Sequence, residues 1–308
     1  MTFEWLSSPS IRLRHSGQAF ETLNLVWYAQ TVMIPNLPTL KILPLESLIL
    51  HEDHDMQRTM PLVARLRRAG ILRNPPIVMP LTDGTDRYMV LDGANRVTSL
   101  TEMEFPHIVA QVVRADDSHV NLQTWNHIVW GMSTKAFVSR IRKIKGLVAT
   151  KVNTFKSLDA PKYVPVQIRL ADGKLYLLAE TPSELEQHID TLHQIVNAYK
   201  TRASLDRTSQ TLIDSFKSVY PDLTALVIFP SFKISTVLKL AAQKIVLPTG
   251  ITRFTVSPRA LHLNYPLHEL SSGKPIEYKE DYLQEWIEDR IKNKGIRFYA
   301  EQTFLFDE

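Results

Sequence analysis

The sequence contains no cysteine, and this absence excludes three kinds of chemistry together. Disulfide bonds, thiolate metal sites and cysteine nucleophiles all require that side chain. The sequence also has no apolar run near the ~20 residues of a membrane-spanning helix. It does not open with a charged segment followed by an apolar one, which is the pattern of a secretory signal. We therefore expect a cytoplasmic protein that has no membrane partner.

A large excess of one charge sign is missing as well. The 36 Lys and Arg residues nearly balance the 32 Asp and Glu residues, which leaves a net charge of +4. This charge permits a nucleotide or nucleic-acid partner but requires neither. The densest basic run, Arg140 to Lys145, has no interleaved aromatic residues on which nucleic-acid bases would stack. We therefore expect a small-molecule partner rather than a nucleic acid, and the oligomeric state stays open.

What is present is the composition of a globular protein. Of the 308 residues, 44% are hydrophobic and 22% are charged, which allows a large core and, at this length, about two domains. Strand and helix patterns alternate along the chain, which predicts the α/β class. We expect an N-terminal extension over residues 1–40, a nucleotide-binding domain over 41–150 and a second α/β domain over 151–308.

Local patterns predict the elements inside these domains. Residues 42–113 are expected to run strand, helix, two strands, helix, strand, and the two central strands form a hairpin over the Asp83-Gly84 turn. Residues Val120 to Trp130 and Thr134 to Lys145 are each interpreted as a helix. The polar stretch from Ser204 to Ser218 is interpreted in the same way.

One stretch, from Met89 to Leu100, joins a strand to a helix through a break at Asp92 and Gly93. The Asp side chain can cap the helix, and the Gly lets the backbone approach a ligand closely. The first helical N–H groups, together with Arg96, suit an anion such as phosphate. Ordinary strand-to-helix connections use the same residue types for capping alone, so this motif by itself leaves both interpretations open.

Two further places carry candidate chemistry. An acidic burst from His51 to Asp55 follows a strand-like segment. It suits a carboxylate facing a cleft better than a metal site, because acids and imidazoles often gather by chance on solvated loops. Arg253 stands between apolar, strand-like neighbours, and the planar guanidinium of arginine is the group that best holds a carboxylate. A solvated acid and an exposed arginine are the plain alternatives.

The order of elements between Ile42 and Val113, with the Asp92 motif at its last helix, resembles the ParB/sulfiredoxin-like superfamily. Within that superfamily the chain looks most like the free serine kinases. The resemblance rests on His51-Glu52, the Asp-Gly motif, Thr124-Trp125-Asn126-His127, Gly250-Ile251-Thr252-Arg253, Arg259-Ala260-Leu261 and Asn264-Tyr265-Pro266-Leu267. The sulfiredoxin branch has a cysteine where this chain has Ala94, so sulfiredoxin chemistry is excluded.

The resemblance implies transfer of a phosphoryl group from ATP or ADP to the hydroxyl of free L-serine, with Mg²⁺ present. It implies that Glu52 is the general base. The chemistry of phosphoryl transfer adds Asp92 as a second catalytic residue and a ligand of Mg²⁺. The expected nucleotide-binding residues are Asp92, Gly93, Ala94, Asn95 and Arg96, and the expected substrate-binding residues are His51, Thr124, Trp125 and Arg253. The sequence departs from the family pattern at Asn95 and Phe254, where histidine is common, and these positions bear on which hydroxy amino acid is the acceptor.

Two other functions stay open. A DNA-binding protein like the ParB segregation factors needs a helix-turn-helix after its N-terminal domain, and the helices expected between Val120 and Lys145 are the place for it. A nucleotide-sensing regulator with the same fold keeps Arg96 and the Asp-Gly turn but does not need Glu52. The presence of a working base at Glu52 therefore separates the kinase from the regulator.

Overall fold

The computed structural model describes residues 37–53, 56–153, 166–180 and 184–299. The chain divides into two compact units, one made of Met1–Leu37 with Arg290–Glu308 and the other of Pro38–Asp289. Both large sheets belong to the second unit. The expected N-terminal extension lies outside the described residues up to residue 36. Of the described helices, none is long and apolar enough to cross a membrane.

The first sheet has five strands in the order β1-β6-β4-β5-β2. Its strands β4 and β5 form the hairpin predicted over Asp83-Gly84, with Met79 opposite Met89. The expected order of elements is confirmed, except that the first strand is split into β1 and β2 and that the short β3 precedes the hairpin. The elements are β1 Leu40–Pro44, η1 Leu45–Ser47, β2 Leu48–Leu50, α2 Met56–Ala69, β3 Ile71–Leu72, β4 Ile77–Pro80, β5 Tyr88–Asp92, α3 Ala94–Glu102 and β6 His107–Val112.

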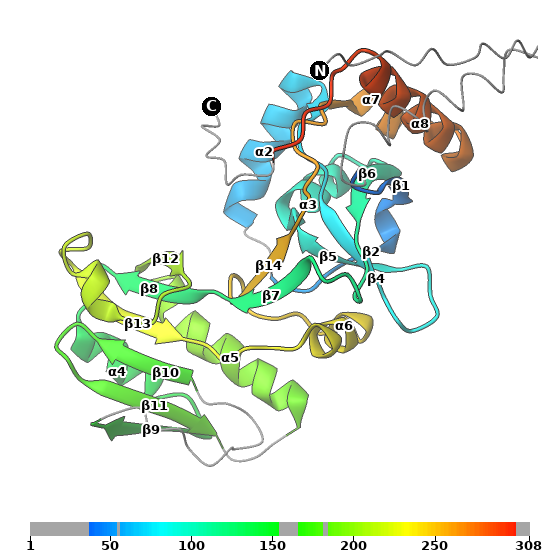
Figure 1. Ribbon diagram of the computed structural model, residues 1–308. Helices are drawn as coiled ribbons and strands as arrows, with labels where there is room; N and C mark the ends of the chain where they lie inside the picture. The colour runs from blue at the N-terminus through cyan, green and yellow to red at the C-terminus, as the bar shows by residue number, and fades with distance from the viewer. Residues whose placement is uncertain (1–36, 54–55, 154–165, 181–183, 300–308) are drawn as a thin grey trace, which may run out of the picture. The chain divides into compact units, whose positions relative to one another are not determined.

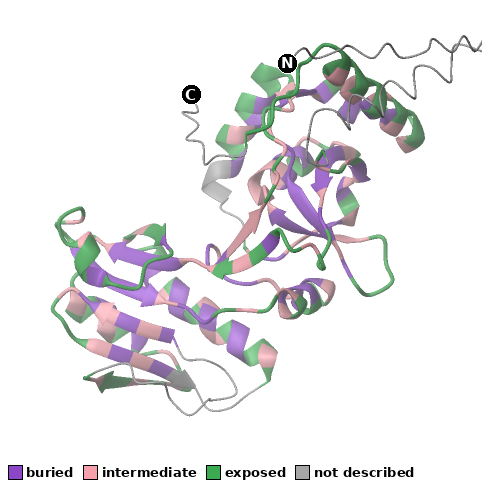
Figure 2. Cartoon of the chain, viewed as in Figure 1, coloured by how far each residue is buried: buried purple, intermediate pink, exposed green. Residues whose placement is uncertain are grey.

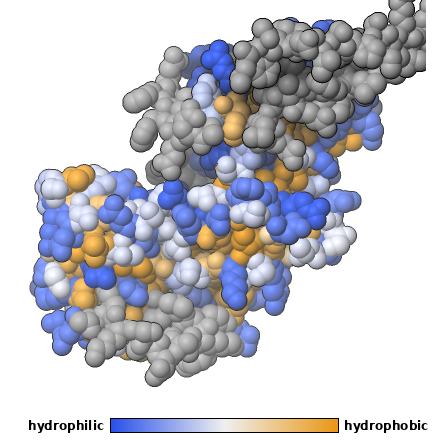
Figure 3. Space-filling view, in the orientation of Figure 1, coloured by the Kyte–Doolittle hydropathy of each residue, from blue (hydrophilic) through white to orange (hydrophobic). Residues whose placement is uncertain are grey.

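Both faces of this sheet are buried, and successive side chains point to opposite faces. On β4, Ile77 and Met79 join one core and Val78 joins the other. Helices α2 and α3 close the second core through side chains such as Leu66 and Leu100. Strands buried on both faces have continuous apolar sequences, and Figure 2 shows these strands as buried. On the face in Figure 3, hydrophilic and hydrophobic residues are interspersed over the described part of the chain.

The parallel pairing of β2 with β5 positions the two acidic candidates. Leu50 lies opposite Val90 in this pair, so both strands end at the same edge of the sheet. Glu52 follows the end of β2, and Asp92 is the last residue of β5. Ligand sites in α/β proteins form outside the carboxyl ends of parallel strands. The topology therefore brings together two residues that are 40 positions apart in the sequence.

The second sheet is antiparallel throughout, with its six strands in the order β12-β8-β13-β10-β11-β9. Helices α4 and α5 pack against one face of it through residues such as Phe137 and Tyr199 (Figure 1). This second α/β arrangement agrees with the predicted fold class. The elements are β8 Asn126–Trp130, α4 Thr134–Ile141, β9 Leu147–Val152, β10 Val166–Leu170, β11 Leu175–Glu180, α5 Leu185–Lys200, β12 Ser204–Thr208, η2 Ile213–Phe216 and β13 Leu223–Ile228.

Two of the expected helices are strands. Where one helix was predicted over Val120–Trp130, the chain forms β7, Val120–Thr124, and then β8. The stretch from Ser204 to Ser218 forms β12 and a single 3₁₀ turn. Exposure alternates along β7, which is the period of a strand. For β8, the choice of a strand over a helix depends on tertiary structure, because β12 and β13 hydrogen-bond to its two edges. The predicted helix over Thr134–Lys145 exists but ends at Ile141.

The two sheets do not divide the chain at the expected domain boundary near residue 150. Strands β8 and β9 both belong to the six-stranded sheet, so the first strand of that sheet begins at Asn126. The division into separate domains stays a prediction.

The last part of the chain connects the two sheets. Strand β14, Thr252–Val256, pairs with β7 so that Thr252 lies opposite Thr124 (Figure 1). The chain then returns to the elements around the first sheet, where β15 pairs with β3 in a separate two-stranded sheet. The remaining elements are α6 Ile234–Ala242, β15 Tyr265–Pro266, α7 Leu267–Ser271 and α8 Ile276–Lys292.

Candidate active site

A cavity of about 790 Å³ lies at the carboxyl ends of β2 and β5. Its wall contains every predicted site residue except Thr124, whose hydroxyl oxygen lies 3.5 Å from the carbonyl oxygen of Pro230. The cavity also has residues that the sequence did not single out for a role in the site. The polar ones are Asp53, Arg207, Thr249, Thr252, Thr255 and Arg259, and the others are apolar.

The carboxylate of Glu52 is held by the backbone of a neighbouring turn. Its Oε2 accepts a hydrogen bond from the N–H of Gly250 at 2.7 Å. Its Oε1 accepts from the N–H groups of Ile251 at 3.1 Å and Thr252 at 2.6 Å, and from the Thr252 hydroxyl at 2.5 Å. A carboxylate has about four lone-pair positions, two on each oxygen. Oε1 is therefore fully engaged, and Oε2 keeps one position for a further donor.

His51, the residue before Glu52, contacts the same turn at Thr252. Its Nδ1–H donates to the carbonyl oxygen of Val90 at 2.5 Å, and its Nε2 lies 2.8 Å from the Thr252 hydroxyl. The ring is buried, with its edge toward the Phe254 ring. Because both ring nitrogens are engaged by the protein, His51 supports the turn that holds Glu52. Its predicted contact with a substrate stays a prediction.

Trp125 and Arg253 meet on the cavity wall. The guanidinium carbon of Arg253 lies 4.3 Å from the centre of the Trp125 ring, which is within the range of a cation–π contact. The backbone N–H of Trp125 donates to the carbonyl oxygen of Ile251 at 3.0 Å. The ring thus orients the guanidinium without neutralising it. No other described residue occupies the hydrogen-bond donors of the Arg253 guanidinium, which are left for an anion.

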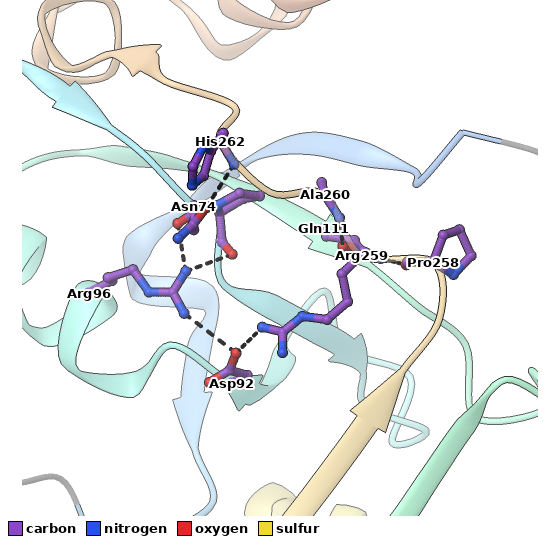
Figure 4. A network of polar contacts seen from close by, with 9 residues as sticks. Asn74, Asp92, Arg96, Gln111, Pro258, Arg259, Ala260 and His262 are labelled. Atoms are coloured by element: carbon purple, nitrogen blue, oxygen red, sulfur yellow. Dashed lines mark hydrogen bonds and ion pairs between the residues drawn. The ribbon is translucent and has the colours of Figure 1, made fainter. Parts of the chain in front are cut away.

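The Asp-Gly motif differs from the predicted cap in one respect. The residue at the N-cap of α3 is Gly93, with φ 95°, and α3 has no side-chain cap hydrogen bond. The Asp92 carboxylate, one residue too early to cap, instead pairs through Oδ2 with Arg96 and Arg259. Figure 4 shows both arginines converging on Asp92. Since no side chain caps α3, its first N–H groups are left for a ligand.

Arg96 is more deeply engaged than the sequence predicted. Its Nη1 donates to the carbonyl oxygens of Asn74 at 2.6 Å and Pro75 at 2.9 Å. Burial lowers the pKa of this guanidinium, and the negative charge of Asp92 opposes that shift. Arg96 therefore braces the loop before β4 against α3 while its charge stays at the cavity. A direct contact between Arg96 and phosphate stays a prediction.

Arg259 reaches the cavity because a buried glutamine clamps its backbone. Gln111, on β6, donates from Nε2 to the carbonyl oxygen of Pro258 and accepts at Oε1 from the N–H of Ala260, both at 2.9 Å (Figure 4). Asn74 holds the next turn of the same segment by accepting from the N–H of His262 at 2.8 Å. Arg259 belongs to one of the motifs on which the family resemblance rests, but no role in the site was predicted for it, because its partners lie on β5 and β6, far away in the sequence.

Arg207 was missed for a different reason. It lies on β12, which the sequence suggested was helical, and its strand partner is His127. Its side chain packs on Gly250, where an added Cβ would fall 2.2 Å from Nε of Arg207. Gly250 also has a positive φ of 76°, so only glycine fits there easily. Arg207 therefore rests on the residue whose N–H binds Oε2 of Glu52.

His127 also contacts this turn, at the carbonyl oxygen of Gly250. Its Nε2 lies 2.9 Å from the carbonyl oxygen of Gly250, and its Nδ1 lies 2.8 Å from the Tyr199 hydroxyl. The side chain is fully buried. Burial, helped by the charges of Arg207 and Lys200, lowers the pKa of His127 to about 4, although the hydrogen bond to Gly250 opposes the shift. The ring is therefore neutral near pH 7, with Nε2–H donating to Gly250.

The charges around the cavity favour an anion with several negative charges. Four arginines line the wall, Arg96, Arg207, Arg253 and Arg259, against three carboxylates, Glu52, Asp53 and Asp92. The start of α3 adds the partial positive charge of a helix N-terminus. The described residues include no group of three or more His, Cys, Asp or Glu side chains that would hold a metal ion by themselves.

Gly93 gives a first prediction. A Cβ at this position would lie 2.9 Å from both Nη2 of Arg96 and Cβ of Pro76. We expect Gly93→Ala to lower the free energy of unfolding by about 1–3 kcal/mol through backbone strain and this contact, and to weaken nucleotide binding as Arg96 shifts. Gly84→Ala is the matched control, because Gly84 has a similar φ of 78° and no heavy atom within 4 Å of its added Cβ.

Urea denaturation and a nucleotide titration of both variants measure the two effects. The control should lose stability through strain alone and should bind nucleotide like the wild type. Equal nucleotide affinity in Gly93→Ala and Gly84→Ala would show that Gly93 and Arg96 do not shape the nucleotide site.

Known proteins share this architecture. The curated ATP-dependent L-serine kinase SbnI from Staphylococcus aureus is 24% identical over 273 residues, which cover 87% of this chain and 97% of SbnI. A structure of SbnI with a C-terminal truncation superposes with a TM-score of 0.65 at 22% identity, covering 82% of this chain and 97% of the other. This chain has the fold of SbnI.

A second solved structure extends the comparison. A free serine kinase carrying a glutamate-to-alanine substitution, in complex with AMP, gives a TM-score of 0.63 at 15% identity and covers 76% of this chain and 94% of that one. No protein-family model matches the chain. The predicted α/β fold is confirmed, and the fold is that of free serine kinases. The ParB/sulfiredoxin-like name for the first domain stays a prediction.

Proposed function

We propose that the protein is a small-molecule kinase that transfers a phosphoryl group from ATP to the hydroxyl of free L-serine, releasing O-phospho-L-serine and ADP. The observation that carries the proposal is the carboxylate of Glu52, held rigidly with one acceptor position open at Oε2 in an arginine-lined cavity. SbnI, similar over 87% of this chain, is named as an ATP-dependent L-serine kinase, which supports ATP as the donor and serine as the acceptor.

We assign the nucleotide and the amino acid to two different ends of the cavity. The phosphates of the nucleotide bind at the start of α3, at residues Gly93 to Asn95, with Arg96 and Arg259 beside them. The amino acid binds where Trp125 orients Arg253, whose guanidinium holds the serine carboxylate. Both ends open on Glu52 and Asp92, which the parallel pair β2 and β5 brings together.

In the reaction, Glu52 takes the proton from the serine hydroxyl at Oε2. The serine oxygen forms a bond to the γ-phosphorus, and the bond between that phosphorus and the bridging oxygen of ADP breaks. Phosphoryl transfer depends mainly on positioning and on neutralising charge, and the arginines and the α3 N–H groups provide both. A general base contributes typically about 10² to 10⁴ in rate.

Asp92 fits the role of the residue that holds Mg²⁺. Its Oδ2 pairs with both arginines, and among the described residues its Oδ1 has no partner. Magnesium sites in kinases use one or two carboxylates together with the phosphate oxygens, so the lack of an acidic cluster in the described chain agrees with this role. When bound, Mg²⁺ neutralises negative charge on the phosphates.

The DNA-binding alternative loses its structural basis. It needed a helix-turn-helix between Val120 and Lys145, and the first half of that stretch is the strand pair β7 and β8. The nucleotide-sensing regulator keeps the same cavity and differs only in lacking turnover.

The test is ³¹P NMR of the purified protein with Mg²⁺, L-serine and either ATP or ADP. We expect a phosphoserine resonance with ATP. If nucleotide binds but no phosphomonoester forms with serine, threonine or homoserine, the protein is the regulator and the kinase proposal is wrong.

A further inference from the structure

Three carboxylates line the cavity, and two of them are already committed. Glu52 accepts four hydrogen bonds from residues Gly250 to Thr252. Asp92 is paired with Arg96 and Arg259. Asp53 has one side-chain partner among the described residues, the imidazole of His193 at 3.3 Å from Oδ2. Among the described residues, Asp53 is therefore the cavity acid with the most hydrogen-bond acceptor positions left for a ligand.

The backbone of Asp53 is fixed on both sides, so the position of its carboxylate is well defined. Its N–H donates to the carbonyl oxygen of Leu247 at 2.9 Å, and its carbonyl oxygen accepts from the Thr249 hydroxyl at 2.9 Å. His193 is in turn anchored by the carbonyl oxygen of Val246, 2.9 Å from its Nε2. The Asp53 side chain is 46% exposed, and its Oδ1 has no partner in the described part of the chain.

The opposite charge pattern is found on two arginines of the same cavity. Arg253 is stacked on Trp125, and Arg207 rests on Gly250. Neither arginine has a carboxylate partner among the residues that the structure describes. A free α-amino acid carries one carboxylate and one ammonium group, and each needs an opposite charge when it leaves water. The unpaired arginines supply the first requirement, and Asp53 is the acid that is left for the second.

We propose that Asp53 binds the α-ammonium group of the acceptor, so that the site selects hydroxy amino acids over hydroxy acids that lack the amino group. This inference rests on the proposed kinase function. Asp53 directly follows Glu52 in the chain. One short segment therefore supplies the base for the hydroxyl and the anion for the ammonium group, which fixes the acceptor at two points beside the reacting oxygen.

The test compares two acceptors that differ by this one group. L-serine and 3-hydroxypropionate share the hydroxyl and the carboxylate, and only serine has the ammonium group. Steady-state kinetics with ATP are measured for the wild type and for Asp53→Asn. Asp116→Asn is the matched control, because Asp116 is an exposed, ion-paired acid that does not line the cavity. His193→Gln tests whether the histidine positions Asp53.

We expect Asp53→Asn to raise KM for L-serine about 10- to 100-fold, as for the loss of a charged hydrogen bond. KM for ATP and KM for 3-hydroxypropionate should stay close to wild-type values, so the preference for serine shrinks by the same factor. His193→Gln should raise KM for serine by a smaller factor, and Asp116→Asn should change neither constant.

Three results would overturn the role of Asp53. They are an unchanged KM for serine in Asp53→Asn, an equal rise in KM for both acceptors, and a raised Mg²⁺ requirement in place of a raised KM, which would make Asp53 a metal ligand. Each of these needs a wild type that phosphorylates L-serine. A wild type that phosphorylates neither acceptor overturns the kinase function itself, so the two failures are distinct.

Discussion

Replacing Glu52 by glutamine is expected to lower kcat for phosphoryl transfer to L-serine by about 10² to 10⁴, with the nucleotide dissociation constant close to that of the wild type. Glutamine keeps the size of the side chain but removes the basic oxygen. Nucleotide binding is preserved because the start of α3 and its arginines lie on other elements, with Asp92 as their partner. The ³¹P signal of phosphoserine and a calorimetric nucleotide titration measure the two quantities.

A second consequence of this substitution must be separated from the loss of the base. The glutamine NH₂ group would face an N–H donor of the turn, at Gly250 or at Ile251 and Thr252, and two donors repel each other. Part of the loss could then come from a displaced turn. Thr252→Val is the control, because it removes one donor to Glu52 and leaves the carboxylate in place.

The control variant should lose far less activity than Glu52→Gln if the carboxylate acts as a base. Equal losses in the two variants would make Glu52 an anchor of the turn. Full activity in Glu52→Gln would remove Glu52 from the mechanism altogether.

Acid is expected to lower the free energy of unfolding by about 3 kcal/mol between pH 6.5 and pH 4 through His127 alone. Folding lowers the pKa of His127 from 6.5 to about 4, mainly because the ring is buried. In this range the unfolded chain binds a proton at His127 and the folded chain does not, so protons favour unfolding. The contribution of His127 is complete above pH 6.5 and is lost as the pH falls toward 4.

The structural reason lies in the two hydrogen bonds of the ring. With Nε2–H donating to Gly250, the neutral ring accepts at Nδ1 from the Tyr199 hydroxyl. Protonation places a second N–H against that hydroxyl, in a site where Arg207 and Lys200 already disfavour positive charge. The strain falls on Gly250, whose N–H binds Glu52.

Urea denaturation at several pH values between 4 and 7 measures this effect. His127→Gln is the informative variant, because an amide can donate to Gly250 and accept from Tyr199 but does not titrate. The free energy of unfolding of His127→Gln should depend less on pH than that of the wild type. Subtracting one stability curve from the other removes the contribution of the carboxylates, which both proteins share. His119→Gln, at an exposed histidine, should keep the wild-type slope. Parallel curves for the wild type and His127→Gln would show that His127 titrates normally.

Much of the first sheet was predictable because its signals are local. The hairpin over Asp83-Gly84 follows from the turn residues and the apolar runs beside them, and the structure has it as β4 and β5. The junction from β5 to α3 is marked by Gly93, whose positive φ few other residues adopt. The acidic segment after β2 was identified as a candidate for the same reason, since charge following an apolar strand is visible in the sequence alone.

The strands of residues 120–130 were not predictable in this way. Their sequence suits a helix or a strand, and the choice depends on β12 and β13, which lie on either side of β8 and come about 80 to 100 residues later in the chain. The helix predicted over residues 204–218 also hid Arg207, which lies on the strand β12.

Local sequence signals were enough to predict the α/β class, the hairpin, the strand-to-helix motif and the residue types available for phosphoryl transfer. How those residues are used depends on contacts between distant parts of the chain. The tertiary structure turned Asp92 from a helix cap into the partner of Arg96 and Arg259, set Glu52 on the Gly250 turn, and left the Asp53 carboxylate with one partner among the described residues. The physical reason is that propensity and turn chemistry act between near neighbours, whereas charge pairing depends on distances in space that the sheet topology creates.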